Sequence, residues 1–362
     1  MAIERIRLLS LGWRQIRVLS VDRISWLLVV ILVIASNKVF AQDPQFSQYY
    51  AAPMYLNPAL VGINQEGRAG INYRNQWPSM MANFETYSFY FDYNFIEHAS
   101  SVGLIVNQDQ EGLIGLKTTN IGAQYAYQVD LNHRWTFRPA VEAGYYWRSI
   151  DFTHLTFPDQ FDDTGLINPT TIENLGQGQA RWFDLSFGGI IFNKNAWFGG
   201  SAHHVLEPNQ SIAGGDVLLR KKVSYHGGYK IPLDRFNPFM QSKLGREWSM
   251  TPTFNYKTQG DFDQLDLGVY FTFEPILTGL WYRGIPLKML EEIPNSEAIV
   301  LMFGLRMGQT MFGYSFDFTL SDLGVSSGGA HEISLIYSFR LGDKSKPSME
   351  IRGLKCPIPY NF

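Results

Sequence analysis

Aromatic and polar residues alternate along much of this chain with a period of two. From Thr86 to Phe95 every odd position carries an aromatic ring, and most even positions are polar. Successive side chains of a β-strand point to opposite faces, so such a segment has one apolar and one polar face. The pattern recurs over Arg134–Arg148 and near residues 68–77, 120–129, 264–273, 312–318 and 332–340. The chain is therefore predicted to consist mainly of two-faced β-strands.

The composition favours a membrane-embedded sheet over a soluble one. Aromatic residues make up 15% of the chain and charged residues only 17%, and no apolar run after Ala41 is long enough for a membrane-spanning helix. Membrane β-barrels carry aromatic girdles at both membrane interfaces. We therefore expect an all-β, transmembrane, antiparallel up-and-down β-barrel in a bacterial outer membrane. A large soluble β-sandwich is the alternative.

The alternation defines about fourteen strands, an even number, as in single-chain bacterial barrels. The expected strands are 68–77, 86–95, 101–109, 118–130, 135–151, 182–192, 196–205, 222–231, 247–259, 264–273, 276–283, 297–307, 310–319 and 331–340. Long and short connections alternate between them, as expected for surface loops and periplasmic turns. The eighth and ninth connections break this rule, and a long connection is expected over 284–296.

A barrel of this size has room for a lumen, which the chain itself could block. Residues 42–67 are expected to form an N-terminal periplasmic or plug segment, 68–340 the barrel, and 341–362 a C-terminal periplasmic tail. Inward-facing charges should pair across the lumen: Arg74, Arg138, Arg148, Glu85, Glu142, Asp92 and Asp266. The residues assigned to the lumen or the plug are Asp43, Gln45, Phe46, Tyr49, Arg74 and Arg138.

The N-terminus has the features of a cleavable signal peptide. Five arginines precede the apolar run Ile24–Ala35, which is shorter than a spanning helix, and Val39 and Ala41 provide small side chains for signal peptidase. We expect a signal peptide over 1–41 and a mature start at Gln42, with a signal anchor as the alternative. The apolar run is not followed by a cysteine, which excludes a bacterial lipoprotein.

Charge and motifs point away from several function classes. Without residues 1–41 the net charge changes from −3 to about −7, which argues against nucleic acid as a partner. The single cysteine, Cys356, cannot form an internal disulfide. No phosphate loop, dinucleotide fingerprint or cysteine-rich metal site occurs, so neither a cofactor nor an enzymatic activity is expected.

Three further groups of residues are of types that occur in catalytic or metal sites. His203 and His204 are adjacent, and neighbours on a strand face opposite ways, so they should not chelate a metal together. Ser201 shares a face with His203, but no oriented acid accompanies them. The loop carboxylates suit calcium in type but not in spacing, and whether they bind it is left open: Asp159, Asp162 and Asp163.

Several segments resemble one known family. They are Gln42–Tyr50, with the sequence QDPQFSQYY, Leu56–Gly62, Tyr73–Trp77, Phe157–Gln160 and Gly328–Ile333. Together they resemble the PorP/SprF family of type IX secretion membrane proteins. Gly329-Ala330 stands where Gly-Ser is commoner in that family. The resemblance covers Gln42 to about Arg340.

The resemblance implies an integral outer-membrane component of the type IX secretion and gliding machinery of Bacteroidota. Such a barrel would support export and surface anchoring of a large protein, such as a gliding adhesin, through that protein's C-terminal domain. Periplasmic ring or motor-linked lipoproteins and outer-membrane lipids would be further partners. The long loop 152–181 offers candidate partner-binding residues: Phe157, Asp159, Phe161 and Ile167. The alternatives are a porin or hydrophobic-solute transporter, and a barrel lipase or acyltransferase using Ser201 and His203.

Overall fold

The computed structural model describes residues 43–64, 67–112, 115–152, 155–162, 165–172, 176–233, 247–290, 293–320, 324–339, 356 and 359. The expected signal peptide and most of the expected tail lie outside this part of the chain. Two compact units are separated at Asp43–Pro44, and the fold described below belongs to the second, Pro44–Phe362.

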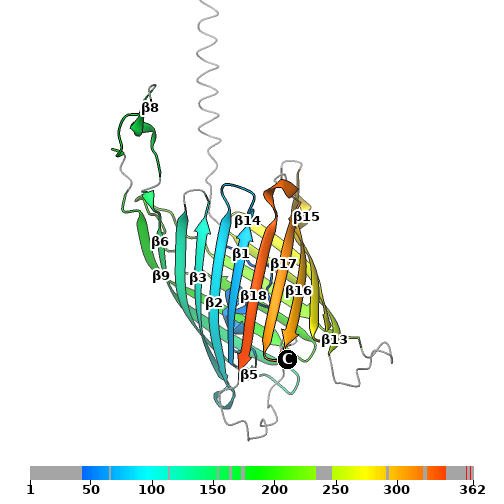
Figure 1. Ribbon diagram of the computed structural model, residues 1–362. Helices are drawn as coiled ribbons and strands as arrows, with labels where there is room; N and C mark the ends of the chain where they lie inside the picture. The colour runs from blue at the N-terminus through cyan, green and yellow to red at the C-terminus, as the bar shows by residue number, and fades with distance from the viewer. Residues whose placement is uncertain are drawn as a thin grey trace, which may run out of the picture. The chain divides into compact units, whose positions relative to one another are not determined.

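The described residues form a closed antiparallel barrel of fourteen long strands, which confirms the predicted fold class (Figure 1). In ring order these strands are β1 (Gly67–Gln76), β2 (Phe84–Phe95), β3 (Ser100–Glu111), β4 (Leu116–Tyr127), β6 (Thr136–Ser149), β9 (Gln179–Phe192), β10 (Ala196–His203), β11 (Lys222–Tyr229), β13 (Trp248–Gln259), β14 (Phe262–Phe273), β15 (Ile276–Leu290), β16 (Ile293–Met307), β17 (Thr310–Thr319) and β18 (Ala330–Phe339). The ring closes because β1 pairs with β18, from Gly67 opposite Phe339 to Gln76 opposite Ala330. Every other wall strand pairs with its neighbours along the chain.

Shorter elements lie in the connections and before the first strand. They are β5 (Val129–Asp130), β7 (Phe161–Asp162), β8 (Gly165–Leu166), β12 (Ile231–Pro232), the helix α2 (Pro53–Leu56) and the 3-10 turns η1 (Pro58–Leu60), η2 (Ile96–His98), η4 (Pro158–Gln160) and η6 (Val325–Ser327). None of the described helices is long and apolar enough to cross a membrane.

The distribution of apolar and polar side chains across the wall is the reverse of that in a soluble protein. On β2, Tyr87, Phe89 and Phe91 are 39–46% exposed, whereas Ser88 and Asp92 are at most 3% exposed. The apolar rings therefore face outward, where outer-membrane lipid would surround them, and the polar side chains face the lumen. This arrangement follows directly from the two-residue alternation.

The two ends of the barrel differ in their connections. One end, here called the outer end, carries the long connections 77–83, 150–178, 204–221 and 320–329. The other, here called the inner end, carries the short turns 96–99, 193–195, 274–275 and 308–309. Long loops mark the cell-surface side of such barrels. The eighth and ninth connections break the pattern as expected, being long at the inner end (230–247) and short at the outer end (260–261).

The eleventh connection differs from the expectation. β15 and β16 continue as a hairpin to Leu290 and Ile293, so the loop expected over 284–296 is mostly strand. The pairing shifts register between Arg283 and Gly284 and again between Ile285 and Met289. These irregularities interrupt the regular alternation that a sequence pattern can detect.

Candidate functional site: the filled lumen and the outer loops

Residues 44–64, here called the lumen segment, run through the barrel from its outer end to its inner end. Gln45 donates to Glu297 Oε1 at 2.8 Å and accepts a hydrogen bond from Lys257. Glu297 lies near the start of β16 and Lys257 near the end of β13, both toward the outer end. At the inner end, the amide of Gly62 donates to Asp92 Oδ2 at 2.7 Å. The segment then joins β1.

A charge cluster holds the first part of the lumen segment. Arg74 and Arg283 share the Asp317 carboxylate at 2.8 and 2.9 Å. The hydroxyl of Ser47 lies among them, accepting from both guanidinium groups at 2.9 and 2.8 Å and donating to Asp317 at 2.7 Å. Glu332 also belongs to this cluster, and all five of its side chains are buried: Ser47, Arg74, Arg283, Asp317 and Glu332. A cluster so buried depends on each charge having its partners.

Glu332 binds the backbone of the lumen segment. Its carboxylate accepts the Ser47 amide at 2.7 Å and the Gln48 amide at 3.2 Å. Arg74 Nη1 lies 3.5 Å from the same carboxylate. Hydrogen bonds to an ionised acceptor are stronger than those between neutral groups. The wall therefore holds this stretch of the segment through main-chain contacts as well as side-chain contacts.

Asn57 fixes the middle of the segment between α2 and η1. Its side-chain nitrogen donates to the carbonyls of Gly189 and Gly200, each at 3.1 Å, and lies 3.0 Å from His226 Nε2. Its side-chain oxygen accepts the Ala59 amide at 2.8 Å and so caps η1. One buried amide thus connects the segment to β9, β10 and β11.

Arginines hold the inner part of the segment through its carbonyls. Arg68 pairs with Asp92 at 2.5 Å and also donates to the Leu60 carbonyl at 3.3 Å. Arg138 donates to the Val61 carbonyl at 2.5 Å and to the Ser101 hydroxyl at 3.0 Å. The segment is therefore bonded to the wall at both ends and in the middle.

Apolar contacts fill the space between these polar contacts. Three buried clusters each combine the lumen segment with a different sector of the wall. They are built around Tyr50 and Ala51, around Ala59, Leu60 and Ile63, and around Met54 and Val61. The second cluster also contains Cys356, which is 1% exposed and brings part of the C-terminal tail into the lumen. The barrel has a hydrophobic core inside it.

Glycines in the wall make room for the lumen segment. A Cβ on Gly188 would lie 2.1 Å from Asn57 Oδ1, and one on Gly103 would lie 2.5 Å from a methyl of Val61. Both separations are shorter than a van der Waals contact. These positions suit glycine because side chains of the lumen segment lie directly against the wall backbone there.

The structure places five of the six expected lumen residues inside the barrel unit. Gln45 and Arg74 contact the charges described above, and Phe46 is 2% exposed with its ring edge-on to Tyr55. Tyr49 donates its hydroxyl to Asp266. Arg138 forms no ion pair with any described carboxylate, contrary to the expected charge ladder, and bonds to carbonyl and hydroxyl oxygens instead. Asp43 ends the other unit, so its assignment stays a prediction.

Of the other inward-facing charges, some form the expected ion pairs and others form hydrogen bonds to neutral side chains. Asp92 and Asp266 pair with Arg68 and Arg283, and Arg148 lies 3.3 Å from Glu111. Glu142 accepts from Gln124 at 2.6 Å, and Glu85 accepts from neighbouring side chains. Sequence reasoning did not single out four central members of the cluster, namely Ser47, Arg283, Asp317 and Glu332. The last three could have been found from their inward parity on their strands, but nothing near Ser47 signals its role.

The candidate partner-binding residues lie in the long β6–β9 connection at the outer end. Phe161 and Ile167 are 47% and 50% exposed, whereas Phe157 is half-buried. Asp159 accepts hydrogen bonds from the Ile172 amide at 2.7 Å and the Thr171 hydroxyl at 2.8 Å. The bond from the Ile172 amide lowers the pKa of Asp159 below its ordinary value. Asp159 therefore orders its own loop.

Whether the loop carboxylates bind calcium stays open, because one of the three is not described. Asp162 is exposed and Asp163 lies outside the described residues. Among the described residues no group of three or more metal-ligating side chains is found.

The expected geometry of the histidine pair is wrong. β10 ends at His203, and His204 adopts a left-handed backbone conformation with φ 56°. Both side chains are therefore buried, their rings 6.4 Å apart, instead of facing opposite ways. His204 Nδ1 lies 2.6 Å from Asp184 Oδ2. Ser201 donates instead to the Leu56 carbonyl at 2.9 Å, and so contributes to holding the lumen segment.

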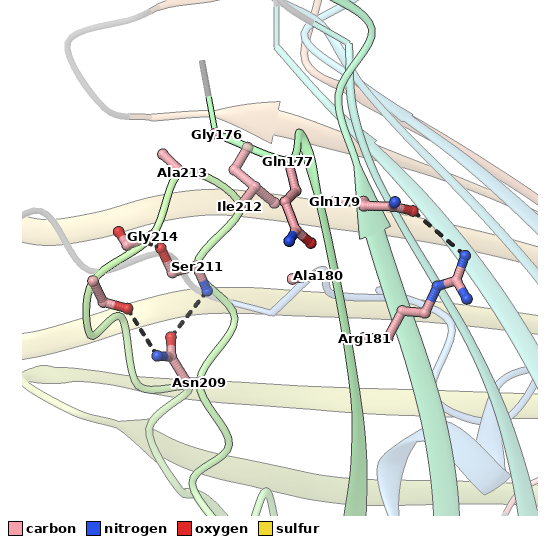
Figure 2. A pocket seen from close by; sticks show the side chains of 11 residues that line it. Gly176, Gln177, Gln179, Ala180, Arg181, Asn209, Ser211, Ile212, Ala213 and Gly214 are labelled. Carbon is pink, nitrogen blue, oxygen red and sulfur yellow. Dashed lines mark hydrogen bonds between the residues drawn. The ribbon is translucent and has the colours of Figure 1, made fainter. Parts of the chain in front are cut away.

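A pocket of about 620 Å³ lies between the β6–β9 and β10–β11 connections (Figure 2). Asn209 shapes one side by bonding to the Gly215 carbonyl and the Ser211 amide. The opposite side is formed by the start of β9, where Arg181 donates to the Gln179 side chain. The pocket is open to solvent at the outer end.

Comparisons with known proteins found distant solved barrels and one family. Solved barrels that the chain resembles include Omp33 of Acinetobacter baumannii (9% identity, 77% of this chain and 100% of that chain, TM-score 0.37) and CdiB of Acinetobacter baumannii (8%, 76% and 60%, 0.41). A mutant of the monoaromatic hydrocarbon channel TodX is similar over 80% of this chain and 94% of that chain (11% identity, TM-score 0.45). Likenesses this distant say nothing about function. The search of curated proteins gave no match.

One family model matches most of the chain. It is described as type IX secretion system membrane protein PorP/SprF, and it matches residues 38–337. The match includes both the lumen segment and nearly all of the barrel wall. The family and the barrel fold together make this an integral outer-membrane protein. The chain belongs to the PorP/SprF family of type IX secretion system membrane proteins.

Proposed function

We propose that this barrel supports export and surface anchoring of a large adhesin, which it holds through the adhesin's C-terminal domain. Membership of a type IX secretion family supplies the context of the proposal. A barrel suits an anchor because its backbone is satisfied only within the closed ladder, so it does not leave the membrane. The protein acts by binding and not by catalysis.

The filled lumen is the observation that carries this proposal. The lumen segment forms buried contacts with every sector of the wall, from Gln45 at the outer end to Gly62 at the inner end. A porin or solute transporter needs a water-filled or ligand-filled passage. Filling of the lumen by the chain itself counts against that alternative and leaves the two ends of the barrel as surfaces for partners.

The outer end carries exposed apolar side chains suited to binding a protein. Phe161, Ile167 and Ile172 are 47%, 50% and 89% exposed on the β6–β9 connection. Exposed apolar side chains grouped on one loop are typical of protein-binding surfaces. We place the adhesin domain on this connection and on the neighbouring β10–β11 connection.

The inner end would face the periplasmic part of the machinery. Its longest connection, 230–247, is much longer than the other turns at that end. We propose that this connection and the C-terminal tail contact periplasmic ring or motor-linked lipoproteins. The barrel would then join a surface protein to machinery below the membrane.

Affinity purification of the tagged barrel from native outer membranes in a mild detergent tests this proposal. The adhesin should be recovered with the wild-type barrel and be lost when Phe161 and Ile167 are both replaced by Ser. The matched control is Leu131→Ser, which changes a 54%-exposed leucine at the inner end. Recovery of the barrel without any surface protein, or equal recovery with the loop variant, would contradict the assignment.

A further inference from the structure

One wall strand has an edge at the outer end that pairs with no other described strand. β9 pairs with β6 along its whole length, from Gln179 to Phe192. On its other side it pairs with β10 only from Phe187 to Phe192. β10 ends at His203, and the chain then turns away into the β10–β11 connection. The eight residues Gln179–Ser186, roughly 27 Å of strand, therefore extend beyond the ladder with β10.

The β10–β11 connection does not complete the ladder along this edge. It touches β9 at the two ends of the gap, where the Val205 amide donates to the Leu185 carbonyl at 3.1 Å and the Gly178 amide donates to the Ile212 carbonyl at 3.2 Å. Between these points, the described residues of the connection make no backbone hydrogen bond to Gln179–Asp184.

The direction of the free groups follows from strand geometry. Backbone groups of alternate residues in an antiparallel strand point to the same side. Since the Leu185 carbonyl faces the β10 side, the amides and carbonyls of Arg181 and Phe183 face that side too. They point toward the gap and not toward β6. An unpaired edge of this kind is a template for another strand.

The pocket between the β6–β9 and β10–β11 connections lies against this edge (Figure 2). Its near side includes Gln179, Ala180 and Arg181, and its far side includes the glycines Gly214 and Gly215. A Cβ added to either glycine would meet nothing within 4 Å, so there is free space on that side. The pocket can therefore admit a further stretch of backbone beside β9.

The positive charge in the pocket favours an added segment that carries a negative charge. Arg181 is exposed and is the only charged side chain among the described residues that line it. Among the described residues, Arg181 hydrogen-bonds only to the Gln179 side chain, at 3.4 Å, and it forms no ion pair with a described carboxylate. A guanidinium so placed can bind a carboxylate through two hydrogen bonds.

We propose that the edge of β9 between Gln179 and Phe183 receives an extended segment of the partner protein as an added strand, and that Arg181 binds a carboxylate on that segment. This mode is β-augmentation, in which main-chain hydrogen bonds supply affinity and side-chain pockets supply specificity. The carboxylate belongs either to an acidic side chain or to the segment's C-terminus. The inference rests on the proposed anchoring function and states how the partner is held.

The test uses the full-length barrel in lipid nanodiscs and short synthetic probe peptides. The probe is an eight-residue Thr/Val peptide with one central Glu and blocked ends. One comparison peptide has Lys in place of Glu, and a second has no acidic side chain but a free C-terminal carboxylate. Binding is measured by fluorescence anisotropy, and protection of the β9 amides by hydrogen–deuterium exchange.

Two variants separate the backbone contribution from the charge. Arg181→Gln removes the charge and keeps the amide, and it should weaken binding of the Glu peptide by about tenfold. Arg181→Pro also removes the amide that faces the gap, and it should abolish binding while leaving the β6 ladder intact, because proline is tolerated where the N–H is not paired within the sheet. Exchange protection of β6 reports whether the wall has remained folded.

The expected result is that the Glu peptide slows exchange at Arg181 and Phe183, whereas the Lys peptide does not. Equal or better binding of the peptide with only a terminal carboxylate would assign the carboxylate to a chain end. Absence of protection with both acidic probes, or equal binding to the wild type and the Arg181→Pro variant, would overturn the inference. If the adhesin is still purified with the Arg181→Pro barrel, this inference fails while the anchoring function stands.

Discussion

Replacing Glu332 with Gln should release the outer part of the lumen segment. The wild-type carboxylate accepts the Ser47 amide at 2.7 Å and the Gln48 amide at 3.2 Å, and it lies 3.5 Å from Arg74. A glutamine of the same shape retains one acceptor and presents an NH₂ group where the second acceptor stood. Arg74 keeps its stronger contact with Asp317 at 2.8 Å. The change therefore acts mainly on the lumen segment and not on the wall.

The size of the effect follows from the bonds that are lost. A hydrogen bond to a charged group contributes about 1.5–3 kcal/mol. Losing one such bond and weakening the other should cost about 3 kcal/mol, which is on the order of a hundredfold in the opening equilibrium of the segment. Exchange of the amides around Ser47 should accelerate by that factor, while amides of the wall strands should not change.

Hydrogen–deuterium exchange of the purified barrel in nanodiscs measures this directly. The matched control is Glu111→Gln, because Glu111 pairs with Arg148 at 3.3 Å with its side chain 23% exposed. A partly exposed pair contributes less than a buried one, so the control should accelerate exchange by less than about fivefold. Unchanged exchange near Ser47 in the Glu332→Gln barrel would refute the reasoning that this carboxylate holds the segment.

Three further outcomes are expected. Gly188→Ala should displace Asn57 and lower the urea midpoint of unfolding, whereas Gly200→Ala, with its nearest contact at 3.3 Å, should have a smaller effect. The pKa of Asp159 is lowered in the folded protein, so this carboxylate stabilises the β6–β9 loop fully above its ordinary pKa and loses that effect as the pH falls through the lowered value. Limited proteolysis should therefore show faster cleavage of the loop only in strong acid. The loop of the Asp159→Asn variant should be cleaved at a similar rate at all pH values. Cys356, 1% exposed, should react with a maleimide much more slowly in the folded barrel than in urea, and equal rates would place it outside the lumen.

The wall of this protein could be predicted from sequence because each strand obeys a local rule. The two-residue alternation identified all fourteen wall strands, since one face must meet lipid and the other the lumen. The β15–β16 hairpin was partly missed because Pro286 and Pro294 interrupt the pattern, and proline normally discourages strand pairing. His204 was missed because the alternation stops with the strand, one residue earlier.

The contents of the lumen could not be predicted in the same way. The lumen segment has no periodicity, and its partners are set by the closed fold and not by sequence proximity. Ser47 bonds to Asp317, 270 residues away, and Asn57 bonds to carbonyls of β9 and β10. The sequence could indicate that a segment before the first strand was available to enter the lumen. The identity of its contacts depends on how the strands close around it.

Single-channel recording in planar bilayers tests the central claim most directly. The full-length barrel should produce no steady current, because the lumen segment fills the passage. A variant that lacks residues 45–60 serves as the positive control and should give stable conductance steps, since the polar inner wall would then be hydrated. Stable conductance of the full-length barrel, equal to that of the deletion variant, would contradict the account and restore the transporter alternative.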